Sequence, residues 1–370
     1  MNEPGEACSL AVGDPGCSAL AGRLLPLATA ILREGYLGGE FAFTLRHQAG
    51  GLLPQGTSTR YSIIACLGLC CLQAAEQREV LAGQDCRELL GVLASRLDDL
   101  TSIGDVALLT WAAAEAGHHE LAHALGRLKV LDGGGVTDVV QAAWVVSALV
   151  AARPLADVEE HLAAARGRLL AARRVVFPHV TGGGPWYRAH VGSFADQVYP
   201  VQALARLHAS ADDQAALAAA NQVAGKISTA QGGDGQWWWH YDARSGDVVE
   251  KYPVYSVHQH SMAPMALLDL ASAGGDSHLG AIRAGLRWLT APPETTQPLI
   301  EPQVPAIWRK VARGDPRKLV RGLAALTTAV SPGWSLPGID RMFPPGAIDR
   351  ECRPYESGWL LYAWLRGGQS

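Results

Sequence analysis

The stretch "TSIGDVALLTWAAAEAGHH", residues 101–119, contains the pattern that decides the fold. A short polar turn with a glycine leads into a helix that is apolar almost throughout and rich in Ala and Leu. The same theme returns at residues 56–75, 135–153, 192–210, 255–275 and 356–368. The repetition predicts six similar apolar helices, each entered through a polar turn.

More polar helices are expected between these six. Residues 86–99, 156–174, 214–227 and 279–291 carry charged side chains on one face and Ala or Leu on the other, as amphipathic helices do. A pair of such helices cannot bury its apolar face alone, so the pairs are expected to stack until a ring closes. Strand signals are nearly absent.

We therefore predict an all-α fold, an (α/α) barrel or toroid of about six helical hairpins. Closure into one ring explains how a chain of 370 residues forms a single domain, which we place at residues 23–370. Residues 1–22 are expected to be a flexible N-terminal segment.

Composition excludes several classes of partner. A hydrophobic content of 48% with 18% charged residues is typical of a globular protein. The net charge is −4 and the basic residues do not cluster, so no nucleic acid partner is expected. The chain has no secretory signal pattern and no apolar stretch long enough for a transmembrane segment, so we expect a cytoplasmic protein.

The seven cysteines include Cys66, Cys70 and Cys71, which lie in an apolar helix pattern. We interpret them as small buried hydrophobic residues in a reducing compartment. No Cys–His spacing accompanies them, so no metal site and no cofactor are expected. Mg²⁺ would be needed only if the substrate were a diphosphate.

Three segments share an unusual composition of aromatic, His, carboxylate and Arg residues directly before an apolar helix. They are residues 184–200, 237–260 and 349–364. In a ring of helices these segments are expected to meet at one mouth. The candidates for substrate binding there are Trp186, Tyr199, Trp237, Trp238, Trp239, Tyr252, Arg353 and Tyr355.

The run "WWWHYD", residues 237–242, is the most distinctive of these patterns. Neighbouring side chains point about 100° apart in a helix and to opposite faces in a strand, so three adjacent tryptophans cannot share one buried face. We interpret the run as aromatic lining of a cavity, with packing inside the barrel as the alternative.

The alternation of helices resembles the six-hairpin glycosidase and α/α-toroid superfamily. That group includes glycoside hydrolases, polysaccharide lyases, sugar epimerases, lanthionine cyclases, protein prenyltransferases and terpene cyclases. Gln231, Gly235 and Trp237 fit the Q…G-x-W core of the repeats in squalene-hopene-type cyclases, where the repeats tie helices together. The D-x-D-D and D-D-x-x-D signatures of terpene chemistry are absent from the sequence.

Trp and Tyr stack on sugar rings, whereas His, Asp, Glu and Arg bind hydroxyl and carboxylate groups. The polar mouth therefore favours a carbohydrate-active enzyme, either a hydrolase or a lyase or epimerase, that works by acid–base chemistry. One alternative is a terpene cyclase-like enzyme that folds an isoprenoid substrate among the same aromatic residues. Another is a non-catalytic glycan-binding protein. The candidates for catalysis are Asp196, His240, Tyr241, Asp242, Tyr255, His258 and Glu356.

Asp242 is the first choice for a general acid, because an acid that follows three tryptophans is expected in a partly dry site where its pKa rises. Asp196 or Glu356 would be the second carboxyl group, opposite Asp242. Two structural alternatives stay open: Asp242 begins the turn "DARSGD", and Glu356 caps the last helix.

Overall fold

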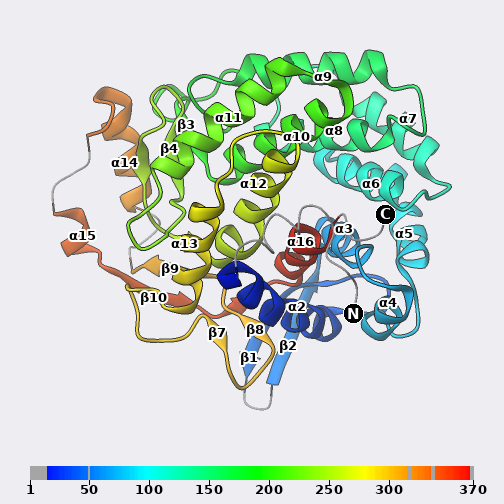
Figure 1. The fold of residues 1–370 in the computed structure, drawn as a ribbon, viewed down its shortest axis with the longest axis horizontal. Coiled ribbons are helices and arrows are strands. Elements are labelled where there is room, and N and C mark those ends of the chain that lie inside the picture. Colours follow the sequence, from blue (N-terminus) through cyan, green and yellow to red (C-terminus); the bar gives the residue numbers. More distant parts are fainter. Residues whose placement is uncertain (1–14, 49–50, 315–318, 335–337, 367–370) are drawn as a thin grey trace.

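Six inner helices follow one another in chain order around a ring (Figure 1). The computed structural model describes residues 15–48, 51–314, 319–334 and 338–366. Each inner helix packs on the next and the last packs on the first, so the predicted (α/α) barrel of about six hairpins is confirmed. The inner helices are α3 (Thr59–Leu69), α6 (Ile103–Glu115), α8 (Val139–Ala152), α10 (Ala195–Ala211), α12 (Ala263–Ser272), which continues the π-helix η2 (His258–Met262), and α16 (Pro354–Leu365).

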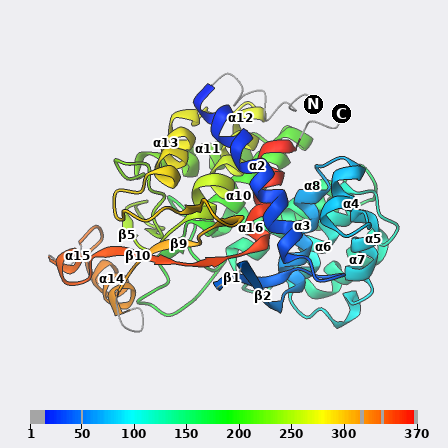
Figure 2. The ribbon, with the colours of Figure 1, turned by 90° about the horizontal axis from the view of Figure 1, so that it is seen from below.

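An outer helix packs against each inner helix. The outer helices are α2 (Pro15–Gly35), α5 (Cys86–Ala94), α7 (Leu121–Leu131), α9 (Glu159–Ala172), α11 (Gln214–Thr229) and α13 (Leu279–Thr290). The sixth hairpin joins the two ends of the chain, because α2 lies along α16 (Figure 2). Residues 15–22 begin α2, with Cys17 and Ala21 buried, so the barrel starts earlier than predicted. Residues 1–14 lie outside the described residues.

Inner and outer helices differ in how much of their surface is buried. In α8, 11 of 14 residues are buried, whereas in α9 only four of 14 are. An inner helix therefore tolerates apolar residues on every side, while an outer helix keeps one polar face toward water. Among the described residues, no helix combines the length and the apolar character needed to cross a membrane.

Short strands occupy the connections that lead from an outer helix into the next inner helix. They are β1 (Ala42–Gln48), β2 (Gly51–Thr57), β3 (Val191–Ser193), β4 (His240–Asp242), β5 (Val248–Glu250), β6 (Val254–Tyr255), β7 (Ile300–Glu301), β8 (Ala306–Ile307), β9 (Lys310–Arg313), β10 (Pro345–Asp349) and β11 (Glu351–Cys352). They form four small antiparallel sheets, ordered β11-β1-β2, β10-β9-β6, β3-β4-β5 and β7-β8. Most have two to five residues, too few to produce the alternation from which strands are predicted.

The remaining helices lie outside the ring. They are α4 (Ala74–Val80), the 3₁₀ turn η1 (Leu97–Asp99), α14 (Leu319–Val330) and α15 (Ile339–Met342). Together with β9 and β10, α14 and α15 extend from one side of the barrel, at the left of Figure 2.

Two glycines close the ring. A side chain at Gly68 of α3 would place its Cβ 2.0 Å from the carbonyl oxygen of Gly358 in α16. A Cβ at Gly358 would lie 2.6 Å from the Cα of Ala65. The first and last inner helices thus touch backbone to backbone, and only glycine permits this approach.

One end of the barrel is closed by a buried polar network. Glu115, the last residue of α6, accepts hydrogen bonds from Trp111 Nε1 at 2.7 Å, Arg206 Nη2 at 2.6 Å and the Tyr362 hydroxyl at 2.7 Å. Arg206 comes from α10 and Tyr362 from α16, so the network ties three inner helices where they end. The opposite end, where the inner helices begin, is where a functional site is expected.

We expect Gly68→Ala and Gly358→Ala each to lower the free energy of unfolding by about 1–3 kcal/mol or more, because the added methyl group overlaps the facing helix. Gly126→Ala in α7 is the matched control: nothing lies within 4 Å of its added Cβ. That variant should keep or gain stability, by up to about 1 kcal/mol, through its helix propensity. Urea unfolding measures the stability of all three variants. An equal change in the free energy of unfolding for all three would contradict the close approach of α3 and α16.

Candidate active site

The mouth at the N-terminal ends of the inner helices contains one carboxyl group in an unusual setting. Glu356 lies in the first turn of α16 and is only 3% exposed. Glu356 is the acidic residue of the first turn, so the capping alternative, an acid at the positive N-terminal end of the helix, fits this position too. Among the described residues, its Oε1 has no hydrogen-bond partner. An unpaired buried carboxyl oxygen is costly, and such groups occur where chemistry requires them.

Burial raises the pKa of Glu356 from 4.5 to about 7, although the guanidinium groups of Arg309 and Arg353 oppose this shift. Both arginines also bind Glu351, at 3.1 Å from Arg309 Nη1 and 3.1 Å from Arg353 Nη2 to its Oε2. Because Glu351 partly neutralises these cations, desolvation has the larger effect on Glu356. The group therefore holds its proton near neutral pH, as a general acid must.

Aromatic side chains surround this carboxyl group. The rings of Tyr61 and Tyr355 stack with centroids 4.1 Å apart, and Arg353 Nη1 donates to the Tyr61 hydroxyl at 2.7 Å. Tyr199 is buried among the rings of Trp144 and Trp359. The structure thus brings Tyr199, Arg353 and Tyr355 together with Glu356, as predicted. Tyr61 was not foreseen, because nothing in residues 56–75 distinguishes it from an ordinary helix residue.

The three tryptophans of the run turn in different directions. Trp237 is fully buried against Phe194, and Trp238 packs against Tyr252. Trp239 is partly exposed and contacts Tyr255, with ring centroids 4.8 Å apart. The prediction that all three line a cavity is therefore wrong for Trp237 and Trp238, which belong to the core. Trp239 is the one that extends the aromatic wall toward Tyr255.

The segment before the run is held to an outer helix. The side-chain amide of Gln231 donates to the carbonyl oxygens of Gly235 at 2.9 Å and Ala281 at 3.0 Å, and Ala281 belongs to α13. Gly235 has a φ of 101°, and a Cβ there would meet the carbonyl oxygen of Ala284 at 2.0 Å. The Q…G-x-W motif therefore ties a connection to a helix, which is the structural role that the resemblance implied.

Asp242 is not placed to act as an acid. Its two oxygens accept hydrogen bonds from Arg244 Nε at 3.0 Å and Nη2 at 2.7 Å, and its backbone carbonyl accepts from Gly246 in a turn. Its neighbour Tyr241 is fully buried in the core beside Phe194. The expectation of a catalytic Asp242 does not fit these contacts, because Arg244 already occupies both of its carboxylate oxygens. The alternative, a turn residue, fits them.

The two candidate histidines are buried and neutral. Burial lowers the pKa of His258 to about 3, and its ring lies between those of Phe194 and Trp239. Burial and the charge of Arg321 lower the pKa of His240 well below its ordinary value. Neither imidazole carries a proton to donate near neutral pH, so both are better described as walls of the mouth than as acids.

Asp196 holds another residue in place. It is fully buried in the first turn of α10, and its Oδ2 accepts from the Ser193 hydroxyl at 2.7 Å and lies 3.1 Å from His179 Nδ1. The hydrogen bond with Asp196 raises the pKa of the partly exposed His179. Asp196 thus orients an imidazole that sequence analysis missed, because His179 lies in a loop without a motif.

A cationic pocket of about 280 Å³ adjoins Tyr255. Its lining includes Arg309 and Lys310 of the β9 region and Arg321 of α14, with Glu250 as an acidic member. The cations of Arg309 and Lys310 lie 5.3 and 5.5 Å from the centroid of the Tyr255 ring. None of these basic residues was a candidate from sequence, since they come from a loop-rich region without a recognisable pattern.

Two predicted substrate-binding residues lie elsewhere. The Tyr252 hydroxyl donates to Glu294 Oε1 at 2.9 Å, so Tyr252 reaches the cationic pocket only with its ring. Trp186 is 70% exposed and contacts Tyr187 on the surface. Neither touches the surroundings of Glu356 in the contacts described.

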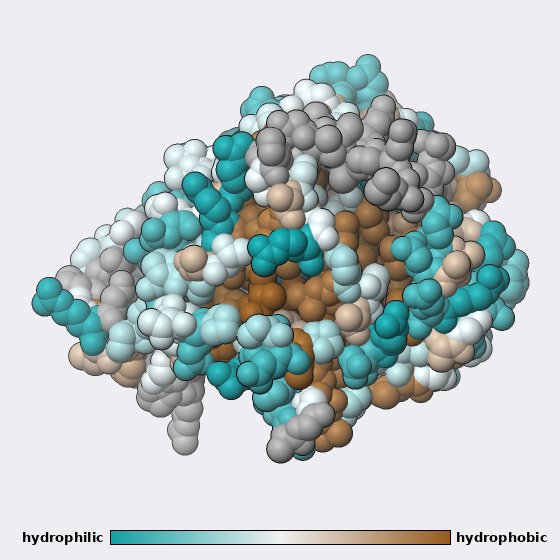
Figure 3. Space-filling model, turned by 60° about the horizontal axis from the view of Figure 1, so that its bottom comes forward, coloured by the Kyte–Doolittle hydropathy of each residue, from teal (hydrophilic) through white to brown (hydrophobic). Residues whose placement is uncertain are grey.

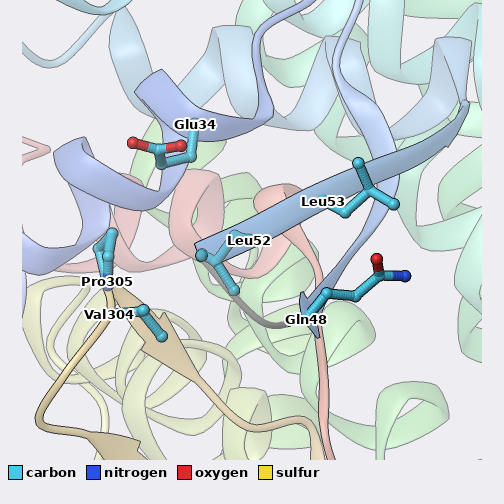
Figure 4. Close-up of a pocket in the computed structure, with 7 residues that line it drawn as sticks. Glu34, Gln48, Leu52, Leu53, Val304 and Pro305 are labelled. Atoms are coloured by element: carbon cyan, nitrogen blue, oxygen red, sulfur yellow. The ribbon is translucent and has the colours of Figure 1, made fainter.

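A second pocket, of about 390 Å³, lies outside the mouth. Figure 3 shows the side that carries the β1–β2 hairpin, with hydrophobic residues in a hollow near the middle and hydrophilic residues around it. The pocket is lined by Glu34 at the end of α2, Leu52 and Leu53 of β2, and Val304 and Pro305 between β7 and β8 (Figure 4). With Glu34 as its acidic member, this lining offers no acid–base pair.

The fold and the mouth define an (α/α)-barrel protein with a buried acid at the N-terminal ends of its inner helices. No protein-family model matches the chain, and no curated protein matches it in sequence. Solved structures share the fold. An unsaturated glucuronyl hydrolase specific for heparin is 13% identical with a TM-score of 0.57, over 93% of this chain and 96% of that one.

Two further structures are similar. The unsaturated glucuronyl hydrolase of Bacillus sp. GL1, described as responsible for the degradation of glycosaminoglycan, is 14% identical with a TM-score of 0.54, over 93% of this chain and 95% of its own. The enzyme of Streptococcus agalactiae is 11% identical with a TM-score of 0.57, over 94% and 90%. At such identities the likeness establishes the six-hairpin barrel fold.

We expect Asp242→Asn to affect stability rather than chemistry. The change removes the charge that binds Arg244 in a buried turn, so the free energy of unfolding should fall by about 1–3 kcal/mol. The catalytic rate per folded molecule should stay within about twofold, because Asp242 does not reach the mouth. Urea unfolding and a steady-state assay measure the two effects. A large rate loss with unchanged stability would restore Asp242 as the acid.

Proposed function

We propose that this chain is a carbohydrate-active enzyme of the glycoside hydrolase type, with Glu356 as its proton donor. The observation that carries the proposal is the Glu356 carboxyl group, which is buried, has an unpaired Oε1 and has a pKa of about 7. The barrel shared with the glucuronyl hydrolases supports this assignment, since one of them is specific for heparin and another is responsible for the degradation of glycosaminoglycan.

In the proposed reaction, protonated Glu356 gives its proton to the oxygen of the leaving group while the glycosidic C–O bond breaks. Water supplies the oxygen that replaces it. The proton that this water loses passes to the solvent. Tyr355 and Trp239 offer aromatic faces on which a sugar ring stacks, whereas the ring of Tyr61 is stacked against both Phe43 and Tyr355. This chemistry needs no cofactor.

The substrate we propose is a glycan that carries an anionic group close to the bond that is cleaved. The pocket beside Tyr255 supports this choice, because its lining has four basic residues, Arg309, Lys310, Arg313 and Arg321, with Glu250 as the acidic one. Asp349, outside the lining, binds Lys310 at 2.8 Å and Arg309 at 3.7 Å, so an anionic substrate would share these two cations with it. Guanidinium groups bind carboxylates through paired hydrogen bonds, which selects acidic sugars over neutral ones.

The other functions fit the mouth less well. A terpene cyclase must stabilise a carbocation, whereas the guanidinium groups of Arg309 and Arg353 near Glu356 would repel one. A glycan-binding protein without catalysis has no need for a buried carboxyl group with a raised pKa.

We also propose a cytoplasmic location, which is consistent with the free thiols of the described cysteines.

The decisive variant is Glu356→Gln, which keeps the shape of the side chain and removes the proton. We expect the rate on the best substrate to fall by about 100-fold or more, with the fold unchanged. The substrates to compare are unsaturated glucuronyl disaccharides, nitrophenyl glucuronides and nitrophenyl glucosides, measured by steady-state kinetics. Asp242→Asn serves as the matched acid-to-amide control. Full activity in Glu356→Gln, or hydrolysis of neutral glycosides alone, would contradict the proposal.

The pKa of Glu356 also predicts how stability depends on pH. The folded protein binds this proton more tightly than the unfolded chain, whose value is about 4.5. The contribution of Glu356 to the free energy of unfolding is therefore fully present below pH of about 4.5. It is lost as the pH rises through about 7, and the loss is on the order of 3 kcal/mol. Activity should fall over the same upper range, because the acid must be protonated.

Urea unfolding at several pH values, on the wild type and on Glu356→Gln, measures this effect. The variant lacks the titrating group, so its stability should change less between pH of about 5 and about 8. Identical pH profiles for the two proteins would show that Glu356 titrates normally.

A further inference from the structure

Three cysteines meet on the outer side of the barrel, away from the mouth. The sulfur atoms of Cys66, Cys70 and Cys86 all lie within 4.8 Å of one another. Cys66 and Cys86 are buried, and Cys70 is partly exposed. Three convergent thiols are a set of soft ligands, and the proposed glycan chemistry uses none of them.

Two helices build this cluster. Cys66 and Cys70 are four residues apart, at one turn of α3 and the residue that follows its end, so they lie on the same face. Cys86 is the first residue of α5, which packs against α3. No metal was expected from the sequence, because no Cys–His spacing accompanies Cys66, Cys70 and Cys71. The fold supplies the third cysteine from a position 16 residues beyond Cys70.

The composition of the cluster selects among ions. Thiolates prefer soft cations such as Cu(I) over hard ones such as Mg²⁺. Zn²⁺ in structural sites takes four ligands, whereas the group formed here by the described residues has three. Three sulfur ligands in a plane are sufficient for a Cu(I) ion.

The surroundings also bear on the charge of such a site. Hydrogen bonds among the three thiols act on their pKa in both directions and burial raises it, so that the pKa of Cys66, Cys70 and Cys86 lies well above the ordinary value. A bound cation would displace their protons. The positive end of the α5 dipole lies at Cys86 and offsets part of the resulting negative charge. The nearby Asp85 is engaged in capping α5.

We propose that Cys66, Cys70 and Cys86 form a trigonal site for a soft monovalent cation, Cu(I), with entry past the partly exposed Cys70. The site is independent of the proposed glycan chemistry, so neither depends on the other. It would tie α3 to α5, on the same inner helix that carries Tyr61 into the mouth.

The test is a competition titration of the reduced full-length protein with the Cu(I)–bicinchoninate complex, without oxygen. We expect the protein to remove one Cu(I) per chain from the chelator and to gain sulfur-to-copper absorption in the ultraviolet. Cys66→Ser, Cys70→Ser and Cys86→Ser should each weaken binding by more than about 100-fold, since even changes around metal ligands cost up to about that much.

The matched control is Cys71→Ser, next to Cys70 but with its thiol directed to the carbonyl oxygen of Leu67. It should bind Cu(I) as the wild type does. Circular dichroism without copper checks the fold of each variant. X-ray absorption on the copper-loaded wild type should show only sulfur atoms around the copper. This measurement does not depend on whether the variants fold.

Four results would overturn the proposal. The first is a wild type that removes no Cu(I) from the chelator. The second is equal loss of binding in Cys71→Ser, and the third is a disulfide between two of the three cysteines in the native protein. Preference for Zn²⁺ with a nitrogen or oxygen ligand would likewise exclude the trigonal Cu(I) site.

Discussion

The contact between Gly68 and Gly358 is the constraint on which the rest of the molecule depends. It brings the first and last inner helices together without side chains between them, and it converts a row of helical hairpins into a closed ring. The same two helices begin at the mouth, α3 with Tyr61 in its first turn and α16 with Tyr355 and Glu356. Closing the ring therefore also sets the 4.1 Å stack of the two tyrosines beside the acid.

The two ends of the barrel show how the surroundings of a carboxyl group decide its pKa. Burial alone would raise the pKa of Glu115, but Arg206 and Arg366 outweigh it and hold that pKa below its ordinary value. At the mouth, burial outweighs Arg309 and Arg353, and the pKa of Glu356 rises to about 7. Glu115 accepts hydrogen bonds from three donors, whereas the Oε1 of Glu356 has no hydrogen-bond partner among the described residues.

The connections into the inner helices combine structural and functional residues within a few positions. In the tryptophan run, Trp237 fills the core, Trp238 packs against Tyr252, and Trp239 contacts Tyr255. Gln231 fixes this connection to α13, so the orientation of Trp239 depends on a hydrogen bond made six residues before the run begins. A short strand then buries Tyr241 and pairs Asp242 with Arg244.

The ring could be predicted from the sequence for two reasons. An inner helix is buried on every side, so it appears in the sequence as an apolar segment, and six such segments repeat. The helices between them have one apolar face, which they can bury only by stacking against a neighbour. The sequence also pointed to the segments before the inner helices as the mouth, and to Arg353, Tyr355 and Glu356 within them. The contacts that distinguish the two candidate acids are visible only in the folded protein. Asp242 and Glu356 look alike in sequence, but an arginine two residues away binds one, while the other is desolvated by rings from distant helices. Tyr61, His179, Arg309 and Cys86 acquire their partners through contacts between segments far apart in the chain, and no local pattern carries that information.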